Sequence, residues 1–234
     1  MRQLIIDTET TGLDPKAGHR IIEFAALELV DRRPTGRTLH LHFDPERDID
    51  FGATEVHGKT WEDLKGRPRF RDRVDEMLDF LRGAEWIIHN APFDVAFLDY
   101  ELAKEGAPRC EALAAGVIDT LAMARDAYPG KRNNLDALCE RFGVSNAHRT
   151  LHGALLDAQL LAEVYLAMTR GQETLTIDIG TAPAIASIAA STLPAARTAL
   201  VVILPTPDEL AAHADYLAAL DRESRGRCLW LAAA

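Results

Sequence analysis

Cysteine is scarce in this sequence, and the few cysteines present are poorly placed for cross-linking or metal binding. Cys110, Cys139 and Cys228 are spread over a chain of 234 residues, with no CxxC motif and no neighbouring histidine at ligand spacing. This pattern argues against both a cysteine-based zinc site and a disulfide framework. We therefore expect a reduced, cytoplasmic protein.

Long hydrophobic runs are also missing. The longest uncharged stretch, residues 179–196, contains Gly180, Pro183 and Pro194 among many small or hydroxyl side chains. That composition is typical of a flexible tether and not of a membrane span. The first residues already have the pattern of a core strand, so we expect no secretory signal peptide.

The third shortage is of positive charge. The formal net charge is −10, and the first 170 residues alone hold 22 Lys and Arg against 29 Asp and Glu. A protein that binds nucleic acid unaided usually has a basic face. A chain of this charge that acts on a polyanion needs cations to offset its carboxylates, or a partner that delivers the substrate.

Hydrophobic periodicity predicts an α/β domain over residues 1–171. Strands are expected at the run Leu4–Ile6 and at 21–30, 38–43, 86–88 and 117–118. Helices are expected at 70–81, from about Pro92, between the strand 117–118 and Ala127, and at 134–142 and 154–168. In the third strand His40 and His42 are expected to point outward. Consecutive strands followed by alternating helices and strands predict a mixed sheet with helices on its faces.

The rest of the chain has a different composition. Residues 172–196 are rich in Thr, Ala, Ser and Pro and are expected to form a flexible linker. Residues 197–234 read as a strand, a turn at Pro205–Pro207 and a helix from about Asp208. Forty residues are too few to build a stable core alone, so this segment is expected to need a partner.

Two carboxylates stand at the end of the first strand. Asp7 and Glu9 are two residues apart, so they share one face if the strand continues through them. Adjacent buried carboxylates repel, and a divalent cation relieves that repulsion; oxygen ligands favour Mg²⁺ or Mn²⁺. The alternative is a simple turn, because Asp and Thr before Gly12 are common turn formers.

Two further acids are candidates for the same site. Asp94 falls in the first turn of a helix with Asn90 as its expected cap, although an acid there also suits the helix dipole. Asp157 falls on the helix face expected to pack on the sheet, where an acid needs a partner. His152 precedes Asp157 by five residues and is either a surface residue or a group held over the site.

The stretches "DTETTG", "HNAPFD" and "HGALLD" strongly resemble the three motifs of the DEDDh 3′→5′ exonucleases. Within that family, "KRNNLDALCERFGV", "RTLHGALLDAQLLAEVYLAM" and "RGRCLW" extend the resemblance to the epsilon, proofreading, subunits of bacterial DNA polymerase III over nearly the whole chain. The resemblance implies a ribonuclease H-like five-stranded α/β fold.

The resemblance also implies the site. Asp7, Glu9, Asp94 and Asp157 are expected to hold two divalent ions, Mg²⁺ or Mn²⁺, with His152 as general base. It further implies substrate contacts from Asp7, Glu9 and Asp157, and from Leu13, His57 and Asn90. His57 has the alternative of capping backbone in a loop. The family often has an acid five residues before this histidine; here that position is Gly52, with Glu55 nearer.

Partners follow from the same resemblance. Gln172, Leu175 and Ile177 have the form of a sliding-clamp-binding peptide, and residues 197–234 resemble the segment that docks on the alpha (polymerase) subunit. The substrate is expected to be a frayed, single-stranded 3′ end of DNA. A small accessory subunit on the exonuclease domain is compatible with the resemblance.

Two other functions fit parts of the sequence. A free-standing DEDDh exoribonuclease that trims RNA, like ribonuclease T or oligoribonuclease, would need the same site, although such relatives usually lack this linker and tail. A non-catalytic factor that bridges polymerase and clamp would not need the five site residues, which are all present.

Overall fold

The computed structural model describes residues 1–147, 151–170, 205–224, 226–228 and 230–231. It divides into two compact units, Met1–Leu175 and Thr176–Ala234. Among the helices of the described residues, none is both long and apolar enough to cross a membrane.

The first unit is built on a mixed sheet of five strands. The strands are β1 (Arg2–Thr10), β2 (Ile21–Val30), β3 (Arg33–His42), β4 (Glu85–Ile88) and β5 (Gly116–Asp119), in the order β3-β2-β1-β4-β5. β1 pairs antiparallel with β2 and parallel with β4, so it lies in the middle of the sheet. The predicted mixed sheet is confirmed.

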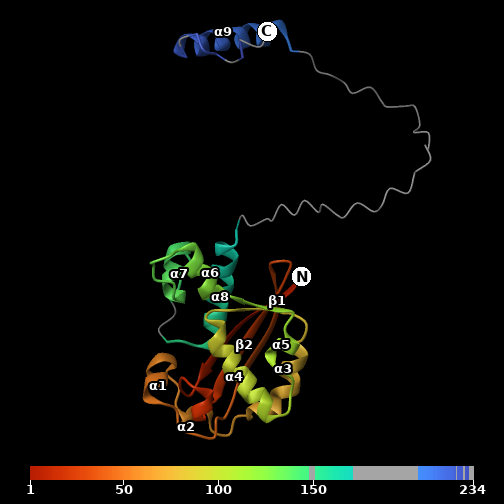
Figure 1. Cartoon of the computed structure of the whole chain (residues 1–234), viewed down its shortest axis with the longest axis vertical. Coiled ribbons are helices and arrows are strands. Elements are labelled where there is room, and N and C mark those ends of the chain that lie inside the picture. The colour runs from red at the N-terminus through yellow and green to blue at the C-terminus, as the bar shows by residue number, and fades with distance from the viewer. Residues whose placement is uncertain (148–150, 171–204, 225, 229, 232–234) are drawn as a thin grey trace, which may run out of the picture. The chain divides into compact units, whose positions relative to one another are not determined.

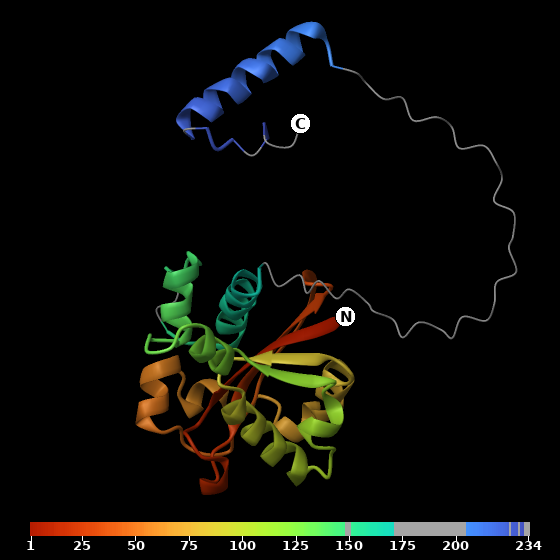
Figure 2. The same ribbon diagram turned by 45° about the horizontal axis from the view of Figure 1, so that its top comes forward.

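Helices cover both faces of this sheet (Figures 1 and 2). The longer ones are α3 (Val74–Leu81), α4 (Ala91–Lys104), α6 (Thr120–Ala127), α7 (Leu135–Phe142) and α8 (Ala154–Met168). Short helical segments are η1 (Pro15–Ala17), α1 (Phe51–His57), α2 (Trp61–Leu64), η2 (Phe70–Arg73) and α5 (Cys110–Leu113). The longer helices lie where the sequence predicted helices; η1, α1, α2 and α5 have too few turns to show a hydrophobic period.

Side chains on the two faces of β1 belong to two separate hydrophobic cores. Leu4 and Ile6 pack with residues of α3, α4 and α5, and Ile5 packs with residues of α6, α7 and α8. All three side chains are fully buried. Because successive side chains in a strand point to opposite faces, a run that is apolar on both faces belongs at the centre of a covered sheet.

β3 begins at Arg33, five residues earlier than its alternation predicts. Residues 33–37 are exposed, so no hydrophobic pattern marks them. A two-residue hairpin turn connects them to β2. Its central residues, Asp31 and Arg32, have positive φ angles of 49° and 64°. Tight hairpin turns require this left-handed conformation at both central residues, which non-glycine residues seldom signal in a sequence.

A buried ion pair fixes α4 against the sheet. Arg20, just before β2, donates from Nε and Nη2 to the two carboxylate oxygens of Glu101 on α4, at 2.6 and 2.8 Å. Glu101 is fully buried. Such a bidentate pair is directional, so it sets the position of α4 as well as neutralising the buried acid.

The second unit contains one long helix, α9 (Pro207–Glu223). Its start is set by a capping box, in which Glu209 N–H donates to Thr206 Oγ1 and the Glu209 side chain accepts from Thr206 N–H. A helix from about Asp208 was expected and is confirmed. The expected linker at 172–196 and the strand at 199–204 lie outside the described residues.

Candidate active site

β1 carries two acids past the hydrophobic core on one face of the sheet. The strand continues through Asp7 and Glu9, and both share the face of Ile5, which α8 covers. Glu9 is buried and Asp7 is half-buried. The alternative of a turn at Asp7 and Glu9 is therefore wrong.

α8 brings a third acid to the same place. Asp157 lies in the first turn of α8, on the buried face that also carries Ala154 and Leu161. The helix is apolar on nearly all sides, so Asp157 is enclosed between it and the sheet. It was expected to need a partner there, and it has one in His152.

His152 lies over this pair of elements. Its Nδ1 is 3.1 Å from Asp157 Oδ2, and its side chain is 42% exposed. The His152 backbone N–H donates to the carbonyl of Val56 on α1, at 3.0 Å, which fixes the loop before α8. One ligand atom from each of Glu9, His152 and Asp157 falls within 4.8 Å of the others.

Asp94 approaches β1 from the opposite face. It lies in the first turn of α4, is buried, and accepts a hydrogen bond from Thr8 Oγ1 at 2.7 Å. Thr8 stands between Asp7 and Glu9, so Asp94 is anchored to the same short stretch of strand. It is outside the group formed by Glu9, His152 and Asp157.

Asn90 does not cap α4 as expected. It occupies the N-cap position in the left-handed conformation, with φ of 69°, and its side chain makes no capping hydrogen bond. Asparagine tolerates this conformation better than most residues, which accounts for its presence at the turn. Its backbone N–H donates to Asp119 Oδ1 at 3.1 Å. Its predicted role in lining a substrate groove stays a prediction.

Burial and mutual repulsion dominate the electrostatics. Burial, followed by the charges of Asp157 and Glu23, raises the pKa of Glu9 to about 7. Burial likewise raises the pKa of Asp94. Carboxylates held in this way gain most from a divalent cation, and their oxygen donors match the preference of Mg²⁺ and Mn²⁺. The residues present therefore fit a divalent metal ion.

A cavity of about 450 Å³ opens beside Glu9. It is lined by Thr8, Glu9, Thr10, Gly12, Leu13, Asp50, Gly52, Ala53, Val56, His57 and Phe93. Leu13 is 85% exposed at this cavity, although an apolar side chain of that size is usually covered. Leu13 and His57, both expected at the substrate, are thus found on one concave surface with Glu9.

His57 contacts backbone with both ring nitrogens. The alternative reading placed it in a loop, but it is the last residue of α1, where it is buried. Nε2 donates to the carbonyl of Thr10 at 3.3 Å, and Nδ1 accepts from the Lys59 N–H at 3.1 Å. Burial, followed by the charge of Lys59, lowers the pKa of His57, so the imidazole is neutral. Backbone capping, the alternative reading of His57, is present together with its place in the cavity.

Sequence reasoning missed Asp50. It precedes α1 at the N-cap position, lines the cavity, and lies 3.4 Å from His19 Nε2. Glu55, which was considered as the acid of this region, is exposed and is not among the lining residues. The start of α1 and a hydrogen bond from the Asp50 backbone N–H to the carbonyl of Thr11, at 3.0 Å, place Asp50 here, and a helix of seven residues gives no periodic signal.

The comparison with known families identifies this chain as a member of the exonuclease family. Residues 4–165 match the family model described as exonuclease, so the chain belongs to that family. A solved structure of exonuclease X in complex with 5′ overhanging duplex DNA shares the fold, with a TM-score of 0.52 at 23% identity, over 71% of this chain and 90% of that one.

Within the family the chain belongs to the DNA polymerase III epsilon subunits. It is 47% identical over 237 residues to that subunit of Pasteurella multocida, covering 98% of this chain and 93% of the relative. The Escherichia coli subunit is 45% identical over 239 residues, covering 99% and 98%. The resemblance that the three motifs indicated is thereby confirmed.

The raised pKa of Glu9 predicts how metal-free protein responds to pH. Because the folded-state pKa rises from 4.5 to about 7, the folded protein binds the extra proton, and stability falls as pH rises through that window. The loss by pH 8 is roughly 3 kcal/mol. Glu9→Gln should flatten the dependence of stability on pH. Mg²⁺ should recover the stability that the wild type loses at pH 8, whereas it should change the stability little at pH 5, where Glu9 is protonated.

Urea denaturation in EDTA at pH 5 and pH 8 measures this effect. The quantity of interest is the difference between wild type and Glu9→Gln, since other groups titrate in both proteins. Equal pH slopes for the two proteins would show that Glu9 is ionised without metal.

Proposed function

We propose that this chain is the 3′→5′ proofreading exonuclease of a DNA polymerase III, removing mismatched nucleotides from 3′ ends of DNA. The observation that carries the proposal is the group of Glu9, His152 and Asp157, whose ligand atoms lie within 4.8 Å beside a cavity of about 450 Å³. Near-full-length similarity to epsilon subunits supports the same conclusion.

Two divalent ions, Mg²⁺ or Mn²⁺, are held by Asp7, Glu9, Asp94 and Asp157 in this proposal. When bound, they supply the activation of a water and the stabilisation of the leaving 3′ oxygen. Asp7, Glu9 and Asp157 share the face of β1 that α8 covers, so they are the acids placed to face the scissile phosphate. Asp94 accepts a hydrogen bond from Thr8, which places its carboxylate beside the stretch of β1 that holds Asp7 and Glu9, and it is the fourth acid of the set.

His152 is the general base. Its Nδ1 lies 3.1 Å from Asp157 Oδ2, so in the neutral imidazole Nδ1 carries the proton and Nε2 is the nitrogen that accepts one. The half-exposed ring is at the mouth of the site, where it can give that proton to solvent. Nε2 takes the proton of the attacking water as the phosphodiester bond breaks.

The cavity takes the 3′-terminal nucleotide. Leu13, exposed at the rim, wedges beside the last base, and His57 contacts the nucleotide from the floor. Asn90, exposed at the start of α4, contacts the chain further along. Because the walls are largely apolar, the cavity favours a base and sugar, with the phosphate at Glu9.

The remaining segments recruit the enzyme to its substrate. Residues 197–234 dock on the alpha subunit, the linker 172–196 tethers the exonuclease domain 1–171, and Gln172, Leu175 and Ile177, outside the described residues, bind the sliding clamp. In α9 the apolar side chains Leu210 and Tyr216 are exposed, which supports a partner there. Tethering raises the local concentration of an acidic enzyme near DNA.

Deleting residues 172–234 is expected to separate the two activities. The shortened protein should keep wild-type release of nucleotides from short single-stranded DNA, because all five site residues precede the cut. It should no longer co-elute with polymerase in gel filtration. Co-elution of the shortened protein with the polymerase subunit would contradict the assigned docking segment.

The proposed function is tested on primers with a single mismatched 3′ end. Purified full-length protein with Mg²⁺ should remove the mismatched nucleotide, and a chelator should stop the reaction. A matched RNA oligonucleotide is the comparison, because the alternative of an exoribonuclease predicts faster cleavage of RNA. Release that continues in chelator, or a clear preference for RNA, would overturn the proposal.

A further inference from the structure

A second cluster of ligand-type side chains lies on the same face of the sheet as the exonuclease site. Glu23 is on β2, and His40 and His42 are on β3. Glu23 pairs with His42 in the register of the two strands, and His40 lies two residues before His42, so all three project from one face. Glu23 also pairs with Glu9 across β1 and β2.

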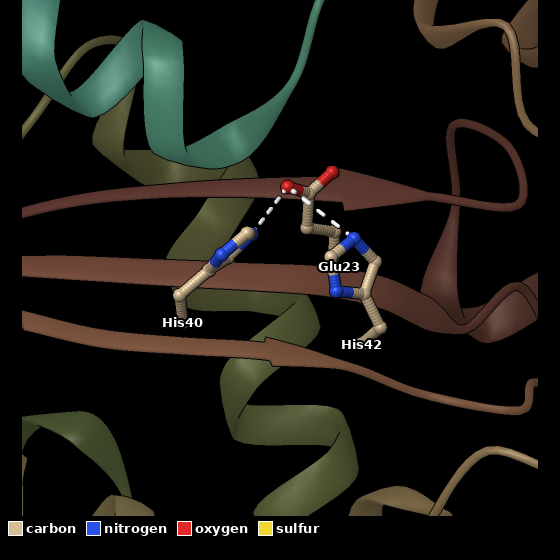
Figure 3. Close-up of side chains that lie close together, drawn as sticks. All are labelled: Glu23, His40 and His42. Carbon is tan, nitrogen blue, oxygen red and sulfur yellow. Dashed lines mark hydrogen bonds and ion pairs between the residues drawn. The ribbon is translucent and has the colours of Figure 1, made fainter.

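The three side chains point toward one another (Figure 3). His40 Nε2 is 2.7 Å from Glu23 Oε1, and His42 Nε2 is 3.7 Å from the same oxygen. Around a tetrahedral zinc ion, ligand atoms stand about 3.4 Å apart when each is 2.0–2.1 Å from the metal. The two contacts fall on either side of that spacing, and all three ligand atoms lie within 4.8 Å of one another.

The surroundings of Glu23 prepare it as an anionic ligand. It is buried, and Lys59 Nζ lies 2.7 Å from its other oxygen, Oε2. Burial opposes ionisation, but hydrogen bonds from Lys59 and His40 outweigh it, so the pKa of Glu23 lies below its usual range. A metal-binding carboxylate commonly has a partner at its second oxygen, and the Lys59 ammonium occupies that position here.

The histidines are prepared as neutral ligands. Each has a side chain that is 30% exposed on the edge strand β3, so an ion can enter from solvent and keep a water as fourth ligand. Burial lowers the pKa of His42, which favours the unprotonated imidazole that a metal ion binds. An entering ion would replace the proton shared between His40 and Glu23.

We propose that Glu23, His40 and His42 form a site for one divalent transition-metal ion of the zinc class. Two imidazole nitrogens with one carboxylate oxygen suit zinc, whereas magnesium prefers oxygen ligands alone. The exonuclease site is richer in oxygen, with Glu9, Asp157 and the nearby Asp7. The two sites therefore select different metals although they share one face of the sheet.

The test uses the full chain with the exonuclease site disabled, so that zinc bound there does not obscure the result. In the Asp157→Asn background, equilibrium dialysis with zinc alone should find one ion that depends on the cluster. His42→Ala on that background should weaken its binding at least about 100-fold. His213→Ala, at an exposed histidine of α9, is the matched control and should change nothing.

Visible absorption of bound cobalt(II) is a second, independent measurement of the same site. The visible absorption that cobalt gains from imidazole ligands should appear in the parent and disappear with His40→Ala or His42→Ala. His42→Gln replaces His42→Ala if the alanine variant does not fold, as judged by Mg²⁺-dependent nuclease activity with Asp157 intact. Absence of the ion from the parent, or unchanged zinc and cobalt binding in the folded histidine variants, would overturn the proposal.

Discussion

Replacing Asp157 with alanine is expected to reduce nucleotide release from a DNA 3′ end by at least about 1,000-fold, because loss of a metal carboxylate removes several kcal/mol of transition-state stabilisation. Asp157 is buried within reach of both Glu9 and His152. The fold should survive, since Asp157 raises the pKa of Glu9 and its removal relieves that repulsion. Asp7→Ala should have the same effect on the rate.

Glu163→Ala is the matched control for Asp157→Ala. Glu163 is an exposed acid on the same helix, α8, so its loss removes one negative charge without touching the site. Initial rates on a single-stranded 3′ end and urea denaturation should be measured for all variants. Turnover by Asp157→Ala or Asp7→Ala at the rate of Glu163→Ala would remove these residues from the metal site.

The second large effect is expected at His152. His152→Ala should lower the rate about 100- to 10,000-fold, the range typical of losing a general base, while Mn²⁺ binding persists. The rate and the metal binding should respond differently because the carboxylates hold the metal ions, whereas the imidazole of His152 accepts the proton. Single-turnover kinetics measure the first quantity and calorimetric titration with Mn²⁺ the second.

His213→Ala, at an exposed histidine of α9, should leave both quantities unchanged. If His152→Ala binds no Mn²⁺, His152 is a ligand or a structural residue. If the rate is unchanged, the proton is taken elsewhere.

The strand and the helix that carry the acids could be predicted from the sequence because both are covered elements, whose apolar residues leave a recognisable pattern. Leu4, Ile5 and Ile6 are apolar on both faces, so their strand had to be central, and its alternation then places Asp7 and Glu9 together. The apolar surface of α8 likewise predicts that Asp157 is enclosed. Residues whose place follows from a long, covered element are the ones that sequence reasoning found.

What it missed depends on short elements or on register. Asp50 stands before α1, a helix too short to show a period; His57 was predicted at the substrate, but its place at the end of this helix was not. Asn90 adopts a left-handed conformation that the capping preference of asparagine does not reveal. His40 and His42 were correctly placed on the outward face, but their partner Glu23 becomes visible only when β2 and β3 are aligned.

Crystals of the protein grown with Mn²⁺ test the central claim most directly, because anomalous scattering locates the ions without reference to activity. Two manganese peaks are expected within ligand distance of the carboxylates of Asp7, Glu9, Asp94 and Asp157. Anomalous maps with no peak at these carboxylates, at a manganese concentration that supports full activity, would contradict the claim.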